Sequence, residues 1–202
     1  MVTKLWPGIF LICIIIIQYS CNESKVIGSA NYQKNEKALD SIHQLYNSLY
    51  NQTPFSLEFN NKSFDDLYIA IYTDSIKYIY QFGITEKRME DTLQKYNVPI
   101  AGIKQLVDLL RKVHCTWITN LDYYENGIQK KLTYISIRSL IPTFPFITTK
   151  YFILIYFEQP QYYDSKGRLM AGKEIRKLRQ INNEIFYRIN DKLAYTVSEK
   201  FR

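Results

Sequence analysis

The spacing of apolar residues changes at Cys115, and that change constrains the fold more than any other feature. Before Cys115, apart from a mixed stretch at residues 55–82, the apolar residues recur every three or four positions, as on one face of a helix. After Cys115 they alternate with polar residues, which is the period of a strand with one buried face. Helices followed by strands predict an α+β fold, with N-terminal helices packed on one face of a C-terminal, mostly antiparallel sheet.

Three helices are expected in the first part. The first covers residues 34–50 and ends at Thr53-Pro54, the second covers 85–96 with Thr85 as its cap, and the third covers 100–113. Arg111, Lys112 and His114 follow at the C-terminal end of the third helix, where the helix dipole favours positive charge. Residues 64–74 are interpreted as a short helix with Asp65 and Asp66 in its first turn, and residues 75–83 as a strand.

The second part predicts an antiparallel sheet. Two strands flank Asn126-Gly127, a strong hairpin signal. Residues 141–149 are expected to form a loop, because their prolines do not fit a central strand. Residues 151–157 are apolar on both faces, which predicts a central strand that is covered on both sides. The sequence YDSKG predicts a turn, and residues 184–201 are expected to form a final hairpin.

The N-terminus has the architecture of an export signal. Lys4 precedes an apolar core from Leu5 to Ile17, and the small Ser20 follows. A helix needs about 20 apolar residues to cross a bilayer, and this core is shorter. A positive start, a short apolar core and a small residue before the cut are typical of a secretory signal.

With Cys21 directly after Ser20, this pattern resembles a bacterial lipoprotein signal, in the looser form of Bacteroidetes envelope lipoproteins. The resemblance implies cleavage before Cys21, whose thiol carries diacylglycerol. Residues 1–20 would then be the signal peptide, 21–33 the lipidated cysteine with a polar tether, and 34–202 a single domain. Asn22 is not the Asp that retains lipoproteins at the inner membrane in enterobacteria, which favours the outer membrane.

The signal also departs from the family pattern. Gln18 and Tyr19 replace the usual Leu-(Ala/Ser) pair. Two alternatives therefore stay open, an uncleaved N-terminal anchor and an ordinary signal in which Cys21 is incidental.

The body of the chain has few residues suited to catalysis or metal binding. His43, His114 and Cys115 are its only histidines and cysteine, so neither a transition-metal site nor a cofactor is expected. The seven glycines are scattered, without a nucleotide-binding loop or a GxSxG elbow. No catalytic residue is assigned, and Cys115 is interpreted as a buried small hydrophobic residue.

Charge is concentrated near the C-terminus. The formal net charge is +7, and residues 165–202 hold ten Lys and Arg against four Asp and Glu. Arg176, Lys177 and Arg179 lie in the densest part, and we interpret them as a basic surface for an acidic partner or lipid headgroups. The alternative is a solvated face. An exported protein rarely meets nucleic acid, so none is expected as a partner.

Three functions follow, in order of preference. The first is a lipid-anchored, non-catalytic binding or assembly module of the cell envelope, with an envelope protein or glycan as partner. The second is an envelope hydrolase acting on glycan or peptidoglycan, through Asp122 and Glu125 or Asp65 and Asp66 as paired carboxylates. It requires a concave pocket that holds at least two of Asp122, Glu125, His43, His114 and Cys115. The third is a carrier whose ligand cavity is lined by residues 151–157.

Overall fold

A computed structural model describes residues 32–125, 127–139, 149–173 and 177–202 of the chain. The chain divides into two compact units, Met1–Asn35 and Glu36–Arg202. All the described strands belong to the second unit, as do helices α2 and α3. The predicted lipidation site Cys21, and most of the predicted tether, lie outside the described residues.

The helices lie close to their predicted positions. Residues 32–50 are helical, and the two further helices are α2 (Lys87–Lys95) and α3 (Ile100–Lys112). Each buries its apolar stripe, with Met89 and Leu93 inside on α2. The N-terminal cap of α2 is Glu86 and its side chain makes no capping hydrogen bond, so the prediction of Thr85 as the cap is wrong.

Eight strands form one antiparallel sheet in the order β3-β2-β1-β4-β5-β6-β10-β9. A separate hairpin consists of β7 (Gln180–Ile181) and β8 (Glu184–Ile185). The strands of the large sheet are β1 (Phe55–Phe59), β2 (Asp66–Tyr72), β3 (Lys77–Gly83), β4 (Cys115–Glu125), β5 (Ile128–Arg138), β6 (Tyr151–Phe157), β9 (Tyr187–Arg188) and β10 (Leu193–Ser198).

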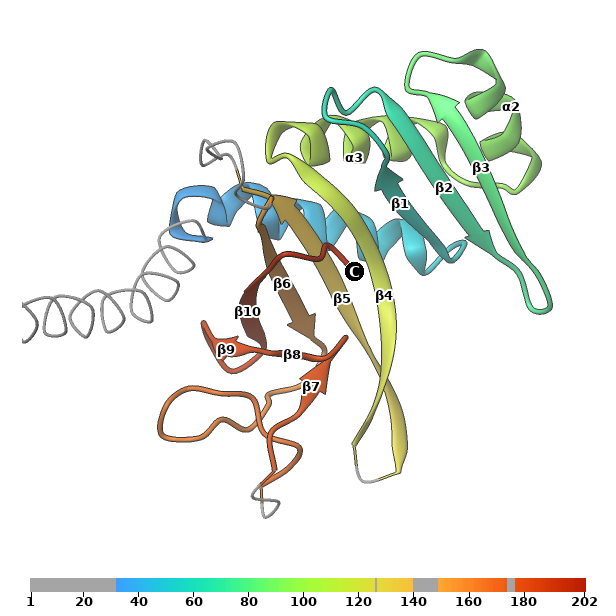
Figure 1. Ribbon diagram of the computed structural model, residues 1–202. Coiled ribbons are helices and arrows are strands. Elements are labelled where there is room, and N and C mark those ends of the chain that lie inside the picture. The colour runs from blue at the N-terminus through green and yellow to red at the C-terminus, as the bar shows by residue number, and fades with distance from the viewer. Residues whose placement is uncertain (1–31, 126, 140–148, 174–176) are drawn as a thin grey trace, which may run out of the picture. The chain divides into compact units, whose positions relative to one another are not determined.

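The fold is α+β, as predicted, and helices lie behind the sheet in the view of Figure 1. The helix of residues 32–50 contacts several strands. Its Tyr46 hydroxyl donates to the carbonyl of Phe55 in β1 (2.7 Å), and Thr133 in β5 donates to the Asn47 side chain (3.2 Å). The His43 ring stacks on Tyr156 in β6, with centroids 4.1 Å apart. This helix therefore ties β1 to β5 and β6.

Residues 64–74 form no helix, so that prediction is wrong. Most of the segment is β2, whose alternate residues Leu67, Ile69 and Ile71 are buried. The same period of two runs through Phe55, Leu57 and Phe59 of β1, a strand that the sequence analysis did not identify. Asp65 and Asp66 resemble the first turn of a helix, but the alternation of large apolar residues determines the structure because it buries one face of a strand.

A second hydrophobic core covers the opposite face of the sheet. Residues from β4, β5, β6 and β10 form this C-terminal core together with Leu169 and Phe186, which are fully buried. Both come from the irregular segment between β6 and β10, so this segment closes the other face of the sheet. The members of the core are Tyr123, Leu132, Tyr134, Ile153, Ile155, Phe157, Leu169, Phe186 and Ala194.

Most of the predicted strand organisation is confirmed. β6 is buried on both faces and lies inside the sheet between β5 and β10. β4 and β5 form the expected hairpin, in which Gly127 has a positive φ of 77°. The YDSKG turn is closed by the Gly167 N–H, which donates to the Asp164 carbonyl (2.9 Å). Of the predicted loop at 141–149, all but the last residue lies outside the described residues.

Tyr134 makes the stability of the fold sensitive to alkaline pH. Burial raises the pKa of Tyr134 to about 12, whereas an unfolded tyrosine titrates near 10. The unfolded chain loses this proton first, so the stability is complete below about pH 10 and falls between about pH 10 and 12. We expect Tyr134 to account for a loss of ~2–3 kcal/mol over that interval.

Urea titrations at pH 9 and pH 11.5 measure this loss. Tyr134→Phe should reduce the difference between the two pH values, whereas Tyr124→Phe, at a residue that is 66% exposed, should leave it unchanged. An unaltered difference in Tyr134→Phe would contradict the expectation.

Candidate functional site

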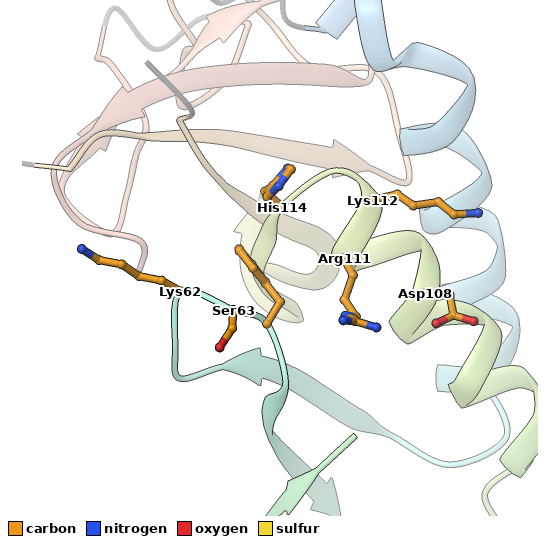
Figure 2. Close-up of a pocket in the computed structure, with 7 residues that line it drawn as sticks. Lys62, Ser63, Asp108, Arg111, Lys112 and His114 are labelled. Atoms are coloured by element: carbon orange, nitrogen blue, oxygen red, sulfur yellow. The ribbon is translucent and has the colours of Figure 1, made fainter. Parts of the chain in front are cut away.

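An open pocket of about 470 Å³ lies where the β1–β2 loop meets the C-terminal end of α3 (Figure 2). We call it the Arg111 pocket. The loop supplies three lining residues, and α3 with the turn into β4 supplies four. They are Lys62, Ser63, Phe64, Asp108, Arg111, Lys112 and His114.

The backbone fixes two side chains in the wall of this pocket. Phe64 and His114 both have a left-handed backbone, with φ of 57° and 56°. This conformation is strained for a residue with a side chain and persists only where the surroundings hold it. Here the two rings meet edge to face at 5.5 Å, and Phe64 is buried. The two positions are therefore mutually supporting, and they join the loop to the helix end.

Three cationic side chains line the pocket and have no ion-pair partner among the described residues. They are Lys62, Arg111 and Lys112, and Asp108 is the only carboxylate in the lining. In Figure 2, Arg111 points into the space between α3 and the loop that carries Ser63, whereas Lys62 and Lys112 extend away from that space on opposite sides. Positive charge therefore predominates around the opening.

The carboxylate of Asp65, close to the pocket in sequence, already accepts hydrogen bonds from neighbouring side chains. The side chains of Asn61 and Ser63 donate to Asp65, and with the smaller effect of the Arg111 charge they lower the pKa of Asp65. Ser63 reaches Asp65 at 2.9 Å, so its hydroxyl proton is committed to that bond. The side-chain donors that remain for a ligand are therefore the three cations and the His114 ring.

Arg138 places a fourth cation behind the wall. Its guanidinium carbon lies 5.3 Å from the centre of the Phe64 ring, and its backbone N–H donates to the His114 carbonyl (2.9 Å). Its Nε and Nη1 atoms are buried and have no hydrogen-bond partner within the described ranges. Buried guanidinium nitrogens are normally paired with an acceptor. Because these two atoms have no such partner, the charge of Arg138 adds to the positive field near the pocket.

A second pocket of about 400 Å³ continues from the first along α3 toward α2. The two share Asp108 and Arg111, while Lys104 of the second pocket is paired with Glu90. Arg111 therefore lies at the junction of the two pockets and can be reached from either.

The residues considered for hydrolysis are dispersed over the fold. Of His43, His114, Cys115, Asp122 and Glu125, only His114 lines the Arg111 pocket, and only Asp122 lines a third pocket of about 390 Å³. His43 lies between its helix and β6, where burial lowers its pKa. None of the three pockets contains two of the five residues.

Cys115 is not poised for nucleophilic attack. It is buried at the start of β4, and burial raises the pKa of its thiol to about 12. The thiol contacts the Trp117 carbonyl at 3.4 Å. A thiol reacts as its thiolate, and very little thiolate forms at neutral pH with this pKa.

The two carboxylate pairs considered for hydrolysis differ in their surroundings. Asp122 and Glu125 are three residues apart on one strand, so their side chains point to opposite faces. Asp122 is exposed, whereas Glu125 is buried and ion-paired with Lys130. Asp65 and Asp66 lie at the start of β2, where Asp66 accepts hydrogen bonds from Gln81. Each carboxylate that the sequence suggested therefore has a different environment from its presumed partner.

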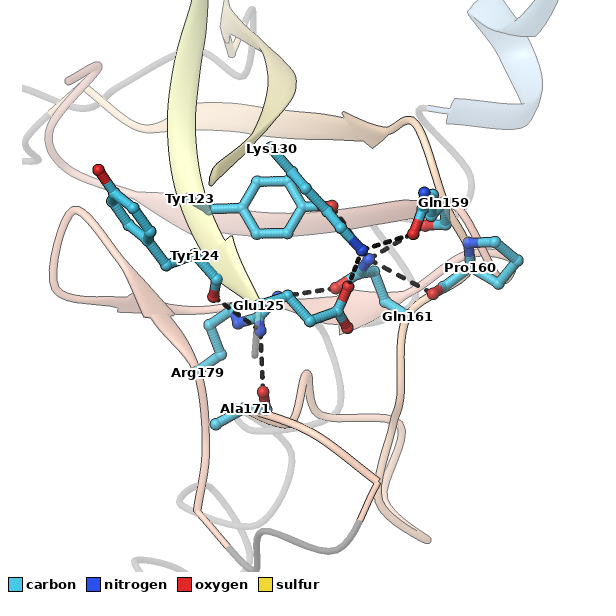
Figure 3. A network of polar contacts seen from close by, with 9 residues as sticks. All are labelled: Tyr123, Tyr124, Glu125, Lys130, Gln159, Pro160, Gln161, Ala171 and Arg179. Carbon is cyan, nitrogen blue, oxygen red and sulfur yellow. Dashed lines mark hydrogen bonds and ion pairs between the residues drawn. The ribbon is translucent and has the colours of Figure 1, made fainter. Parts of the chain in front are cut away.

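The structure describes two of the three residues of the predicted basic surface near the C-terminus, and these two differ in exposure. Arg176 lies outside the described residues, and Lys177 is exposed. Arg179 is half-buried and belongs to a network at the end of the β4–β5 hairpin (Figure 3). Its guanidinium donates to the Gln161 side chain (2.7 Å) and the Ala171 carbonyl (2.8 Å), and it lies 5.2 Å from the centre of the Tyr123 ring. Arg179 therefore connects segments of the fold.

Two further kinds of site that the sequence analysis considered can be compared with the structure. The described residues contain no group of three or more His, Cys, Asp or Glu side chains that could hold a metal ion. No residue of β6 lines any of the three pockets, so the carrier cavity expected at residues 151–157 is not among them.

Comparison with models of protein families, with curated proteins and with solved structures gives no match.

Proposed function

We propose that this chain is a lipid-anchored, non-catalytic binding module of the cell envelope, and that the Arg111 pocket binds an anionic group of its ligand. The observation that carries the binding part is the set of unpaired cations around one opening: Lys62, Arg111 and Lys112. The signal-like N-terminus with Cys21 supports the anchor, and Asn22 favours the outer membrane.

The helix dipole explains only part of this positive charge. Arg111 and Lys112 lie in the last turn of α3, where cations stabilise a helix without any ligand. Lys62 comes from the β1–β2 loop and Arg138 from β5, so neither is near enough in sequence to serve as a cap. Cations from separate segments around one opening favour an anion, and Arg111 can bind a phosphate or carboxylate with two parallel hydrogen bonds.

The size of the pocket indicates more than a small ion. A volume of about 470 Å³ lies within the ordinary range of small-molecule sites. The exposed carboxylate of Asp108 can accept hydrogen bonds from hydroxyl groups. A phosphorylated or carboxylated sugar of an envelope glycan has both an anionic group and hydroxyl groups.

The non-catalytic part of the proposal is supported by the state of the candidate nucleophile. Cys115 has a strongly raised pKa and is buried at the start of β4, and it is not among the residues that line the Arg111 pocket. No helix in the described part of the chain is long and apolar enough to cross a membrane.

The binding assignment is tested with Arg111→Gln and a matched control. Calorimetric titration of the wild-type chain with glucose 1-phosphate should show binding, and Arg111→Gln should weaken it by roughly 10-fold or more, the usual effect of losing a charged hydrogen bond. Lys166→Gln removes an exposed charge outside the pocket and should bind like wild type. Equal binding by both variants, or no binding by wild type, would refute the assignment.

The anchor is tested separately by the intact mass of the protein extracted from native membranes. A chain that starts at Cys21 and carries added diacylglycerol and acyl mass is expected. An unprocessed chain from Met1 would refute the anchor and leave the binding result unaffected.

A further inference from the structure

β3 forms one edge of the eight-stranded sheet, beside α2 in Figure 1. It pairs with β2 from Asp66↔Gly83 to Tyr72↔Lys77 without a shift in register. The other long side of an edge strand presents N–H and C=O groups that can pair with another strand.

Hydrogen bonds at the two ends of β3 show which residues face outward. The Thr73 N–H donates to the Ile76 carbonyl (2.9 Å), and the Ile84 N–H donates to the Asp65 carbonyl (3.0 Å). Ile76 and Ile84 therefore direct their backbone groups toward β2. The direction alternates along an antiparallel strand, so the odd-numbered residues between them face the free edge. These are Lys77, Ile79, Gln81 and Gly83.

Glu86 closes one end of this edge. Its carboxylate accepts from the Gly83 N–H (3.2 Å), and its own N–H donates to the Gly83 carbonyl (2.9 Å). The outward groups of Lys77, Ile79 and Gln81 have no such partner in the part of the chain that the structure describes. The open edge is therefore the segment from Lys77 to Gln81.

This open edge lacks the features that usually prevent strand pairing. It has no proline and no bulge, and its only charged residue, Lys77, lies at one end. Ile79, in the middle, is 60% exposed, with its side chain on the sheet face opposite Tyr78 and Tyr80. A regular edge with an apolar residue at its centre and its one charge at the end is suited to adding another strand.

We infer that this edge pairs with the same edge of a second copy of the chain, antiparallel, about a two-fold axis at Ile79. In this register Lys77 faces Gln81, Tyr78 faces Tyr80, and Ile79 faces its own copy. No like charges meet, and an apolar or aromatic pair forms on each face of the joined sheet. The strand is thus complementary to itself, as a two-fold interface requires.

The interface is small. A ladder of three outward residues on each strand buries far less than the ~800 Å² per partner of a standard interface. The dimer is therefore weak and reversible, and it has to be trapped to be measured.

Cysteine cross-linking of the full chain in its native membranes tests the inference. Across the axis, the two Ile79 Cα atoms would lie about 5.5 Å apart, within the range of a disulfide. Ile79→Cys should therefore give a disulfide-linked dimer under mild oxidation. Ile76→Cys is the matched control, because Ile76 is 52% exposed but would lie roughly 20 Å from its copy in this register. The wild-type chain under the same treatment gives the background from its own cysteines.

The register has its own test. Differently tagged Lys77→Cys and Gln81→Cys chains should cross-link when they are mixed, and neither should cross-link efficiently with itself. Dimers from Ile79→Cys above the Ile76→Cys level, with the mixed pair, would support the inference. Equal cross-linking of Ile79→Cys and Ile76→Cys, or of neither, would overturn it, and so would efficient self-pairing of the Lys77→Cys chain.

Discussion

Phe186→Ala should destabilise the domain by about 3–5 kcal/mol, a large part of the ~5–15 kcal/mol that holds a typical domain together. Phe186 is fully buried in the C-terminal core, against residues of β4, β5, β6 and β10. Truncation removes the contacts of its ring and leaves a cavity between the irregular segment and the sheet. The Phe186 carbonyl also accepts from the Leu169 N–H (2.9 Å), so loss of the ring also weakens the packing around this backbone hydrogen bond.

Urea titration followed by fluorescence measures the effect. Trp117 packs against the C-terminal core, 5.1 Å from the Tyr134 ring between centroids, and reports on this face of the sheet. Tyr162→Ala is the control, since Tyr162 belongs to the same irregular segment but is 43% exposed, and it should change the stability by less than ~0.5 kcal/mol. A cost below ~1 kcal/mol for Phe186→Ala would mean that the segment does not fold cooperatively with the sheet.

The fold class could be predicted because the signals that determine it are local. Apolar spacing in residues 100–113 and alternation in residues 115–125 each reflect one buried face of one element. The failure at residues 64–74 has a physical reason. Acidic residues before an apolar run suit a helix N-terminus as well as a turn before a strand. The structure resolves the ambiguity by pairing β2 with β1 over five residues.

The candidate site could not be predicted, because it depends on long-range pairing. Arg111 and Lys112 were noticed only as cations that suit the end of a helix. Lys62 joins them because β1 pairs with both β2 and β4, which brings the β1–β2 loop to the end of α3. The left-handed backbone of Phe64 has no sequence signal, since glycine or asparagine is the usual residue in that conformation.

Two members of the C-terminal core were missed for a similar reason. Leu169 and Phe186 lie in a segment with short strands and turns, where neither helical nor strand periodicity marks a buried face. The same segment carries the basic residues that suggested a surface for a partner. Arg179 instead joins Gln161 and Ala171, which lie in different parts of that segment. From the run of charged residues alone, one could not tell a solvated cation from one that, like Arg179, forms hydrogen bonds between different segments of the fold.

The stability of the domain should depend on Tyr46, on the helix side of the sheet, about as strongly as it depends on Phe186. Tyr46 is fully buried, its ring lies edge-on to Phe55 at 5.2 Å, and its hydroxyl donates to the Phe55 carbonyl (2.7 Å). The ladder between β1 and β4 covers only Leu57 and Glu58, so this carbonyl lies beyond it and takes its hydrogen bond from the helix instead.

Two substitutions at Tyr46 separate the ring from the hydroxyl. Tyr46→Ala removes both and should cost about 3–5 kcal/mol. Tyr46→Phe keeps the ring but leaves the buried carbonyl of Phe55 without its donor, which should cost ~1–3 kcal/mol. Tyr50→Phe is the control one turn further along the helix, because it keeps the ring of the half-buried Tyr50 and removes a hydroxyl whose hydrogen bond to Lys131 is long (3.3 Å).

Urea titration at pH 7 gives the three free energies of unfolding. We expect Tyr50→Phe to lie within ~0.5 kcal/mol of wild type. If the free energy of unfolding of Tyr46→Phe lay equally close to that of wild type, the Tyr46 hydroxyl would not be needed as a donor to the Phe55 carbonyl. The cost of Tyr46→Ala would then come from the lost packing of the ring.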